Sequence, residues 1–350
     1  MKNITFVKMS QSNCLCFVAF SGAAIHKFLI KNTYGEFQNV ALPLELSLYG
    51  GDASMAGATI GPVAGRVKYG ILNIEGREFD LEKNEGENHI HGGTKGLECS
   101  AFEPVDFHES EDGSYLTLKC VLGDGVCGFP GNREFYVTYI LKGRKDQVSL
   151  RIEYDAVSDK DTYIDMTNHT YWNLNGFPDD YPRIDEGSGS RAGFLSGTQQ
   201  HLMINADRVI YNDHEHLPQR ICPVKGTAFD FIRPVLIRDR IDEYPDDPQL
   251  KNALGYNNAF ILRNSGSLSP SAALLSGDKS LKMEMYTDQP SVVLYSGGYL
   301  DFPSAGIALE AQNIPDAQRF MPECFNILKS GEHFYRFIEY RFFNATGNGS

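Results

Sequence analysis

The chain has 350 residues, of which 42% are hydrophobic and 12% aromatic, so it can bury a sizeable core. Its formal net charge of -13 would repel a polyphosphate backbone, and its Lys and Arg residues are scattered, so we expect no nucleic-acid binding. It contains no apolar run near the roughly 20 residues needed to span a bilayer, so we expect no membrane role.

The N-terminal segment, residues 1–30, has the pattern of successive short strands. Its apolar part is short and contains Cys14 and Cys16, so we expect no signal peptide. The seven cysteines are an odd number, and Cys120 lies in an alternating strand pattern where a small buried hydrophobe would serve. Reduced thiols fit this pattern best, which predicts a cytoplasmic protein.

The glycine-rich stretch "GATIGPVAGRVKYG", residues 57–70, has some likeness to a phosphate-binding loop. It lacks the GK[ST] ending and no long helix follows it, so we expect no nucleotide site. Arg66 within it is either a surface charge or a residue whose guanidinium N–H groups donate hydrogen bonds to a substrate oxygen.

The next motif, "NHIHGG", places His89 and His91 two residues apart. In a strand these side chains would point to one face and could hold a metal. Further ligands at a suitable spacing are missing, as are HExxH and CxxC, so we expect no metal site. The two glycines after His91 suggest a close approach of the backbone to another group, which is weak support for a ligand there.

Period-two alternation recurs along the chain and predicts many half-buried strands. The segments that show it most clearly are 115–122, 133–142, 147–155, 280–286 and 291–297. Residues 143–146 between two of them have a hairpin-like sequence. No segment longer than about twelve residues has a helical period with caps, so the fold class expected is all-β and antiparallel, with little helix.

Two irregular stretches, 176–200 and 238–250, are rich in Gly, Ser, Pro and Asp. Either could be a domain linker. Strand patterns of the same kind resume on both sides, so we interpret them as long surface loops beside a binding site. The chain is therefore expected to form a single β-sandwich domain over 1–350.

The segment "DMTNHTYWNLNG", residues 165–176, combines His169 with Tyr171, Trp172 and several Asn residues. The histidine alone could be a hydrogen-bonded structural residue. Amides and flat aromatic surfaces bind sugar hydroxyls and sugar C–H faces respectively, so this segment favours a sugar site.

The segment "GIALEAQNIPDAQRF", residues 306–320, begins as an apolar strand that contains one carboxylate, Glu310. A glutamate in this position is either a paired structural carboxylate or a group that moves a proton.

Seven motifs taken in order resemble those of the aldose 1-epimerases, or galactose mutarotases, over roughly residues 55–325. They are "GATIGPVAGRV", "NHIHGG", "NHTYWNLNG", "INADR", "GTAFDF", "TDQPSVVLYSGGYL" and "GIALEAQNIPDA". The resemblance implies a large antiparallel β-sandwich, the galactose mutarotase-like supersandwich, with the sugar in a cleft on one sheet.

The resemblance also implies that Glu310 and His169 are the catalytic pair and that Arg66 and His91 contact a small sugar substrate. In such a reaction a base removes the proton of the C1 hydroxyl and an acid protonates the ring oxygen, so the ring opens and can close on the other face. This chemistry needs no metal and no cofactor. We expect a monomer or a homodimer.

Three positions depart from the family pattern. Pro62 stands where the family often has Arg, Gly65 where it has Asn, and Asn257 where an Asp binds sugar hydroxyls. These departures leave the preferred sugar open. Two other functions would fit the same fold: a non-catalytic sugar-binding or regulatory protein, and an epimerase of a modified or phosphorylated sugar. The lack of clustered basic residues near the motifs argues against the phosphorylated sugar.

Overall fold

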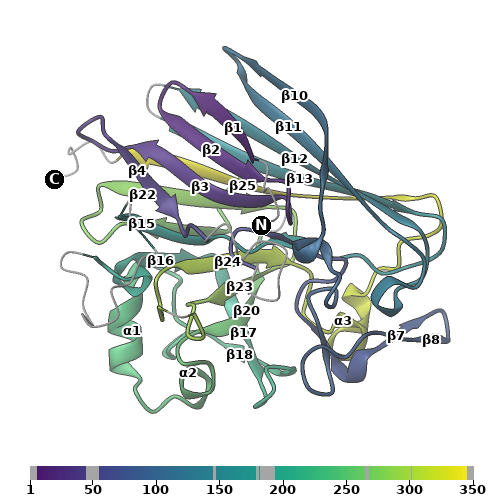
Figure 1. Ribbon diagram of the computed structural model, residues 1–350. Helices are drawn as coiled ribbons and strands as arrows, with labels where there is room; N and C mark the ends of the chain where they lie inside the picture. Colours follow the sequence, from purple (N-terminus) through teal and green to yellow (C-terminus); the bar gives the residue numbers. More distant parts are fainter. Residues whose placement is uncertain are drawn as a thin grey trace.

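The structure is a computed structural model that describes residues 6–44, 55–144, 147–178, 181, 194–264, 268–300 and 302–344. Two large antiparallel sheets dominate it and pack face to face (Figure 1). This confirms the predicted antiparallel β-sandwich.

The ten-stranded sheet consists, in spatial order, of β1 (Phe6–Gln11), β2 (Cys14–Ala19), β3 (Ala24–Lys31), β4 (Phe37–Ala41), β15 (Tyr171–Phe177), β24 (Ile307–Gln312), β23 (Ser291–Tyr295), β20 (Asn257–Leu262), β17 (Ala206–Asn212) and β18 (Pro218–Pro223). The nine-stranded sheet consists of β10 (Glu103–Ser110), β11 (Gly113–Leu122), β12 (Arg133–Arg144), β13 (Gln147–Ser158), β25 (His333–Asn344), β22 (Leu281–Thr287), β21 (Ala272–Leu275), β16 (His201–Ile204) and β19 (Val235–Leu236).

Shorter ribbons and helices accompany the two sheets. The two-stranded ribbons are β5 (Thr59–Ile60) with β14 (Thr167–Asn168), β6 (Arg66–Val67) with β9 (His89–Ile90), and β7 (Ile71–Ile74) with β8 (Arg77–Asp80). The α-helices are α1 (Ile237–Glu243), α2 (Pro248–Ala253) and α3 (Ala317–Phe320). Among the described helices none is long and apolar enough to cross a membrane.

The alternation in the sequence corresponds to the two faces of the strands. In β13, every second residue from Val148 to Ser158 is buried, and the residues between them are partly exposed. β12 and β13 form the expected hairpin, with Arg144 opposite Gln147. Cys120 is buried in β11, as its pattern predicted.

Aromatic side chains join the two sheets. Phe28 and Trp172 of the ten-stranded sheet contact Phe342 and Tyr340 of the nine-stranded sheet, with ring centroids 4.9 Å apart for both Phe28–Phe342 and Trp172–Tyr340. All four side chains are fully buried. Because rings of this size bury much apolar area, this contact is a main source of cohesion between the sheets.

The interpretation of 238–250 as a long loop is wrong, because most of this stretch lies in α1 and α2. Asp247 caps α2 by accepting hydrogen bonds from the N–H groups of Gln249 and Leu250, and Pro248 occupies the first turn. Helices of seven and six residues are too short to show a helical period in the sequence. Most of the other predicted loop, 176–200, lies outside the described residues.

We predict that Phe342→Ala lowers the free energy of unfolding by about 3–5 kcal/mol, because it leaves a cavity between the sheets. Urea unfolding followed by the fluorescence of Trp172, the only Trp, measures this. Phe107→Ala on the exposed strand β10 is the control, with an expected change within about 0.5 kcal/mol. A loss below about 1 kcal/mol for Phe342→Ala would contradict the importance of this contact.

Candidate active site

The site lies on the face of the ten-stranded sheet that points away from the other sheet. In β24, Ile307, Leu309 and Ala311 belong to the core between the sheets, whereas Glu310 and Gln312 line a pocket of about 1140 Å³. The alternation of a strand therefore explains the acid that interrupts this apolar segment.

Two neighbouring strands extend the floor of the pocket. Val293 of β23 lies opposite Glu310, and Tyr295 lies opposite Asn257 of β20. Val293, Tyr295, Asn257 and Ala259 all line the pocket. Asn257 therefore occupies the pocket floor two strands away from Glu310.

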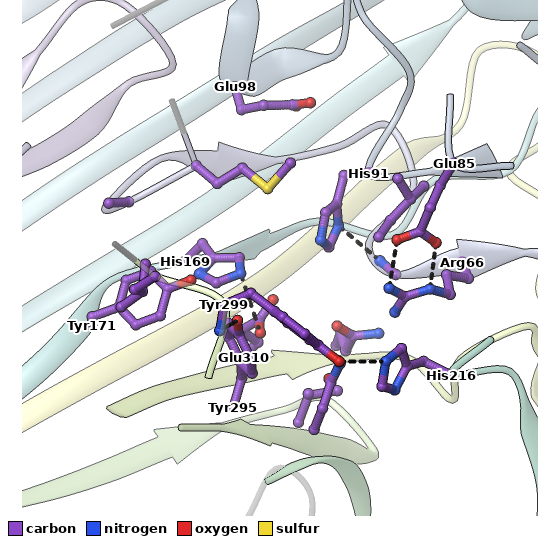
Figure 2. Close-up of a pocket in the computed structure, with 18 of the residues that line it drawn as sticks. Arg66, Glu85, His91, Glu98, His169, Tyr171, His216, Tyr295, Tyr299 and Glu310 are labelled. Atoms are coloured by element: carbon purple, nitrogen blue, oxygen red, sulfur yellow. Dashed lines mark hydrogen bonds and ion pairs between the residues drawn. The ribbon is translucent and has the colours of Figure 1, made fainter. Parts of the chain in front are cut away.

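His169 follows the short ribbon of β14 and β5, which brings it beside β24. Its backbone N–H donates to Ala58 O and its carbonyl accepts from Gly57 N–H, both at 2.9 Å. Its Nε2 lies 3.6 Å from Glu310 Oε1, and the two residues are 4% and 3% exposed. An imidazole and a carboxylate thus lie side by side, and both are almost completely buried (Figure 2).

The surroundings of Glu310 act on its affinity for a proton. Burial raises the pKa of Glu310 above its ordinary value of 4.5, and the positive charges of His169 and Arg66 partly oppose this rise. A carboxylate with a raised pKa is a stronger base than an exposed one.

Arg66 lies on a side wall of the pocket and is paired with Glu85. Its Nε and Nη2 donate to the two carboxylate oxygens of Glu85 at 2.6 and 2.7 Å (Figure 2). The Arg66 side chain is 16% exposed and the Glu85 side chain 39%. Arg66 is thus not an isolated surface charge, and its remaining N–H groups are available to the pocket.

His91 occupies the same wall, just after β9. Its Nδ1 accepts the N–H of Gly65 at 3.1 Å, which in the neutral ring places the proton on Nε2. Burial lowers the pKa of His91 well below its ordinary value, and His169 and Arg66 lower it further. His91 is therefore a neutral donor in a fixed orientation.

Two of the family departures lie next to this wall. Gly65 has a positive φ of 73°, a conformation that Gly and Asn adopt more readily than other residues. Pro62 is not among the described residues that line the pocket, and its carbonyl accepts the N–H of Asp165 at 2.7 Å.

The interpretation of the two glycines after His91 as a sign of a ligand is wrong for Gly92. A Cβ atom on Gly92 would lie 2.1 Å from the carbonyl oxygen of Gly61. The close approach is therefore to the protein's own backbone, and it explains why glycine is needed there.

His89 and His91 do not form the pair that was considered for a metal. His89 Nδ1 lies 2.7 Å from Glu82 O, and its ring packs against Phe129, while His91 lies beyond the strand with a φ of 54°. A different set comes together, because the ligand atoms of His91, His169 and Glu310 all lie within 4.8 Å of one another. This set could hold a metal ion, although one ring nitrogen of His91 is already hydrogen-bonded to the protein.

Of the two aromatics in 165–176 that were expected to form a sugar surface, only one lies at the pocket. Tyr171 lines the pocket, but Trp172 points to the opposite face and is buried between the sheets. The amides of Asn168 and Asn173 donate to backbone carbonyl groups, so they hold the fold together.

Several lining residues escaped the sequence analysis, namely Glu85, Glu98, His216, Tyr295 and Tyr299. The imidazole Nε2 of His216 lies 3.3 Å from Tyr299 Oη, and the Tyr299 N–H donates to Tyr295 Oη at 3.1 Å. The one sequence signal for Glu85 was its position in a polar turn, six residues before His91.

The comparisons with known proteins agree with one another. A family model described as aldose 1-epimerase matches residues 6–341. The galactose mutarotase of Sus scrofa is 29% identical over 328 residues, which cover 89% of this chain and 86% of the relative. The aldose 1-epimerase of Haemophilus influenzae is 31% identical over 324 residues, covering 87% and 86%. The crystal structure of galactose 1-epimerase from Lactobacillus acidophilus matches with a TM-score of 0.83 and 28% identity, covering 99% of this chain and 96% of that one.

We predict that the Glu310 carboxyl titrates above pH 4.5, because burial disfavours its charged form. The test is ¹³C NMR of protein labelled at the glutamate side-chain carboxyl, with the resonance assigned by its loss in Glu310→Gln. Arg66→Met should move this titration to higher pH, since it removes a cation that favours the carboxylate. A midpoint at or below 4.5 would contradict the prediction.

Proposed function

The chain belongs to the aldose 1-epimerase family and interconverts the α and β anomers of a free aldose, and we propose that Glu310 is its general base and His169 its general acid. It is therefore an isomerase. In the forward direction, the Glu310 carboxylate takes the proton of the C1 hydroxyl while the imidazolium of His169 protonates the ring oxygen.

Transfer of these two protons breaks the bond between C1 and the ring oxygen and leaves an open-chain aldehyde. Rotation about the bond between C1 and C2 presents the other face of the aldehyde. Re-closure uses the same residues in reversed roles, so that Glu310 returns a proton to the C1 oxygen and His169 recovers one from the attacking hydroxyl. The enzyme ends each turnover in its starting protonation state.

The observation that carries this assignment is the separation of 3.6 Å between His169 Nε2 and Glu310 Oε1. The C1 hydroxyl oxygen and the ring oxygen are bonded to the same carbon, so an acid and a base that serve them must lie side by side. The raised pKa of Glu310 supports its role as base, because greater proton affinity favours proton removal.

The side wall formed by Arg66, Glu85 and His91, called the polar wall below, and Asn257 on the floor supply the proposed substrate contacts. His91 Nε2–H donates to a sugar oxygen, since Nδ1 already accepts the Gly65 N–H. Arg66 donates through N–H groups that its pairing with Glu85 leaves over. Asn257 on the floor makes a neutral amide contact.

An uncharged sugar suits this pocket better than a phosphorylated one. Among the described lining residues, Arg66 is the only Lys or Arg, and its charge is paired with Glu85. A phosphate group would therefore find no unpaired Lys or Arg among the described lining residues.

The proposal also includes the domain organisation, the cellular compartment and the oligomeric state. The core joins both sheets into one cluster, which supports a single domain over 1–350. All seven cysteines are free thiols, which supports a reducing compartment, the cytoplasm. A monomer or homodimer remains the prediction for the oligomeric state.

We predict that Glu310→Gln lowers kcat for mutarotation at least about 100-fold, because the amide cannot take the C1 proton. Polarimetry on freshly dissolved α-glucose, α-galactose and a pentose measures the rate. Glu134→Gln, on the outer face of β12, is the matched control and should keep wild-type rates. A residual rate above about a tenth of wild type would assign the base to another residue.

We also predict that Asn257→Asp lowers KM for at least one common hexose by up to roughly tenfold, with a smaller effect on kcat. An ionised acceptor forms hydrogen bonds about twice as strong as a neutral one. The same polarimetric assay, run over a range of sugar concentrations, separates KM from kcat. Unchanged constants for every aldose would place Asn257 outside the substrate contacts.

A further inference from the structure

The polar wall contains a carboxylate to which no role has been assigned. Three described glutamates line the pocket: Glu85, Glu98 and Glu310. Glu310 is the proposed base. Burial raises the pKa of Glu98 to about 8, so this side chain is mainly neutral at pH 7. Glu85 is then the one ionised carboxylate in the described lining that is not needed for proton transfer.

The loop that carries Glu85 is held firmly in place. Its backbone forms a reciprocal pair with Asn88, since Asn88 N–H donates to Glu85 O at 2.9 Å and Glu85 N–H donates to Asn88 O at 3.1 Å. The neighbouring Asn84 side chain bonds to both backbone groups of Ile90, at 2.8 and 3.0 Å. The backbone that carries Glu85 is thus fixed beside β9, the strand that also positions His91.

The pairing with Arg66 leaves hydrogen-bonding capacity on both partners. An ionised carboxylate has about four acceptor sites and a guanidinium has five N–H donors. The two bonds at 2.6 and 2.7 Å use two of each. The Glu85 side chain is 39% exposed and faces the pocket, where Figure 2 shows it beside Arg66 and across from His216. The remaining donors and acceptors therefore lie next to each other on one wall.

From this geometry we propose that Glu85 binds the sugar directly, and that the Glu85–Arg66 pair recognises two adjacent ring hydroxyls. One hydroxyl donates to a Glu85 carboxylate oxygen, and its neighbour accepts from an Arg66 N–H. This inference rests on the proposed function, because it assumes a sugar in the pocket.

The pairing suits vicinal hydroxyls for a chemical reason. A hydroxyl group is both a donor and an acceptor, so a row of them is matched best by a donor and an acceptor side by side. Bonds from a hydroxyl to an ionised carboxylate are short and strong. Because the Glu85 charge is compensated by Arg66, the pair offers such bonds without presenting a net charge to a neutral ligand.

The test is Glu85→Gln, with Glu87→Gln as the matched control. Glu87 lies two residues further along the same loop, is mostly exposed and pairs with Lys83. We expect Glu85→Gln to raise KM for glucose or galactose about tenfold with little change in kcat, since a charge-assisted bond becomes a neutral one. Glu87→Gln should leave both constants unchanged. An unchanged KM for Glu85→Gln would overturn the proposal.

A set of monodeoxy sugars locates the contact. The sugars are the 2-, 3-, 4- and 6-deoxy forms. For most of them the KM of Glu85→Gln should be about ten times that of wild type. For the one sugar that lacks the bound hydroxyl, this ratio should fall to about one. A ratio that is the same for all of these sugars would contradict a direct hydrogen bond.

A double-mutant cycle separates direct binding from mere support of Arg66. If Glu85 acted only by orienting Arg66, Glu85→Gln would have no further effect in an Arg66→Met background, and the proposal would fail. Direct binding predicts that a KM increase of several-fold persists there.

Calorimetric titration of sugar into Glu310→Gln protein, with and without Glu85→Gln, repeats the test without turnover. If the wild-type protein did not catalyse mutarotation but sugar binding still depended on Glu85, the proposed function would be refuted. The proposed contact between Glu85 and the sugar would still stand.

Discussion

The site depends on keeping a carboxylate and an imidazole next to each other where water hardly reaches. Burial of a charged carboxylate costs free energy unless opposite charges or donors surround it. Strand β24 meets this requirement with two different faces: Leu309 and its neighbours anchor the strand in the core, while Glu310 faces His169. His169 comes from a point in the chain about 140 residues earlier and is fixed by backbone hydrogen bonds to Gly57 and Ala58. The backbone positions from which the two side chains extend are therefore set by the sheet and by these hydrogen bonds.

Arg66 adjusts the electrostatics of the same site. Arg66 lowers the pKa of Glu310, which favours the ionised form, but it does not cancel the increase due to burial. The charge of Arg66 and the proton affinity of Glu310 are thus coupled.

Much of the fold was visible in the sequence because strand alternation is a local signal. The alternating strands, the buried Cys120 and the hairpin at β12 and β13 followed from this signal. The same rule, applied strictly to residues 171 and 172, would have placed Tyr171 and Trp172 on opposite faces. Helices α1 and α2 were missed because they are shorter than two full periods. Glu85 was missed for another reason: a carboxylate in a polar turn looks like a surface charge until long-range pairing places it beside Arg66.

The position of β25 in the nine-stranded sheet has a consequence for how the protein is made. β25 is the last strand of the described chain, yet it lies in the middle of the sheet, between β13 and β22. On the ribosome, β13 is synthesised almost 180 residues before its partner β25. The edge of β13 that pairs with β25 therefore stays unpaired during much of translation. Exposed strand edges pair readily with other chains. We therefore expect this edge to need shielding until β25 has been translated.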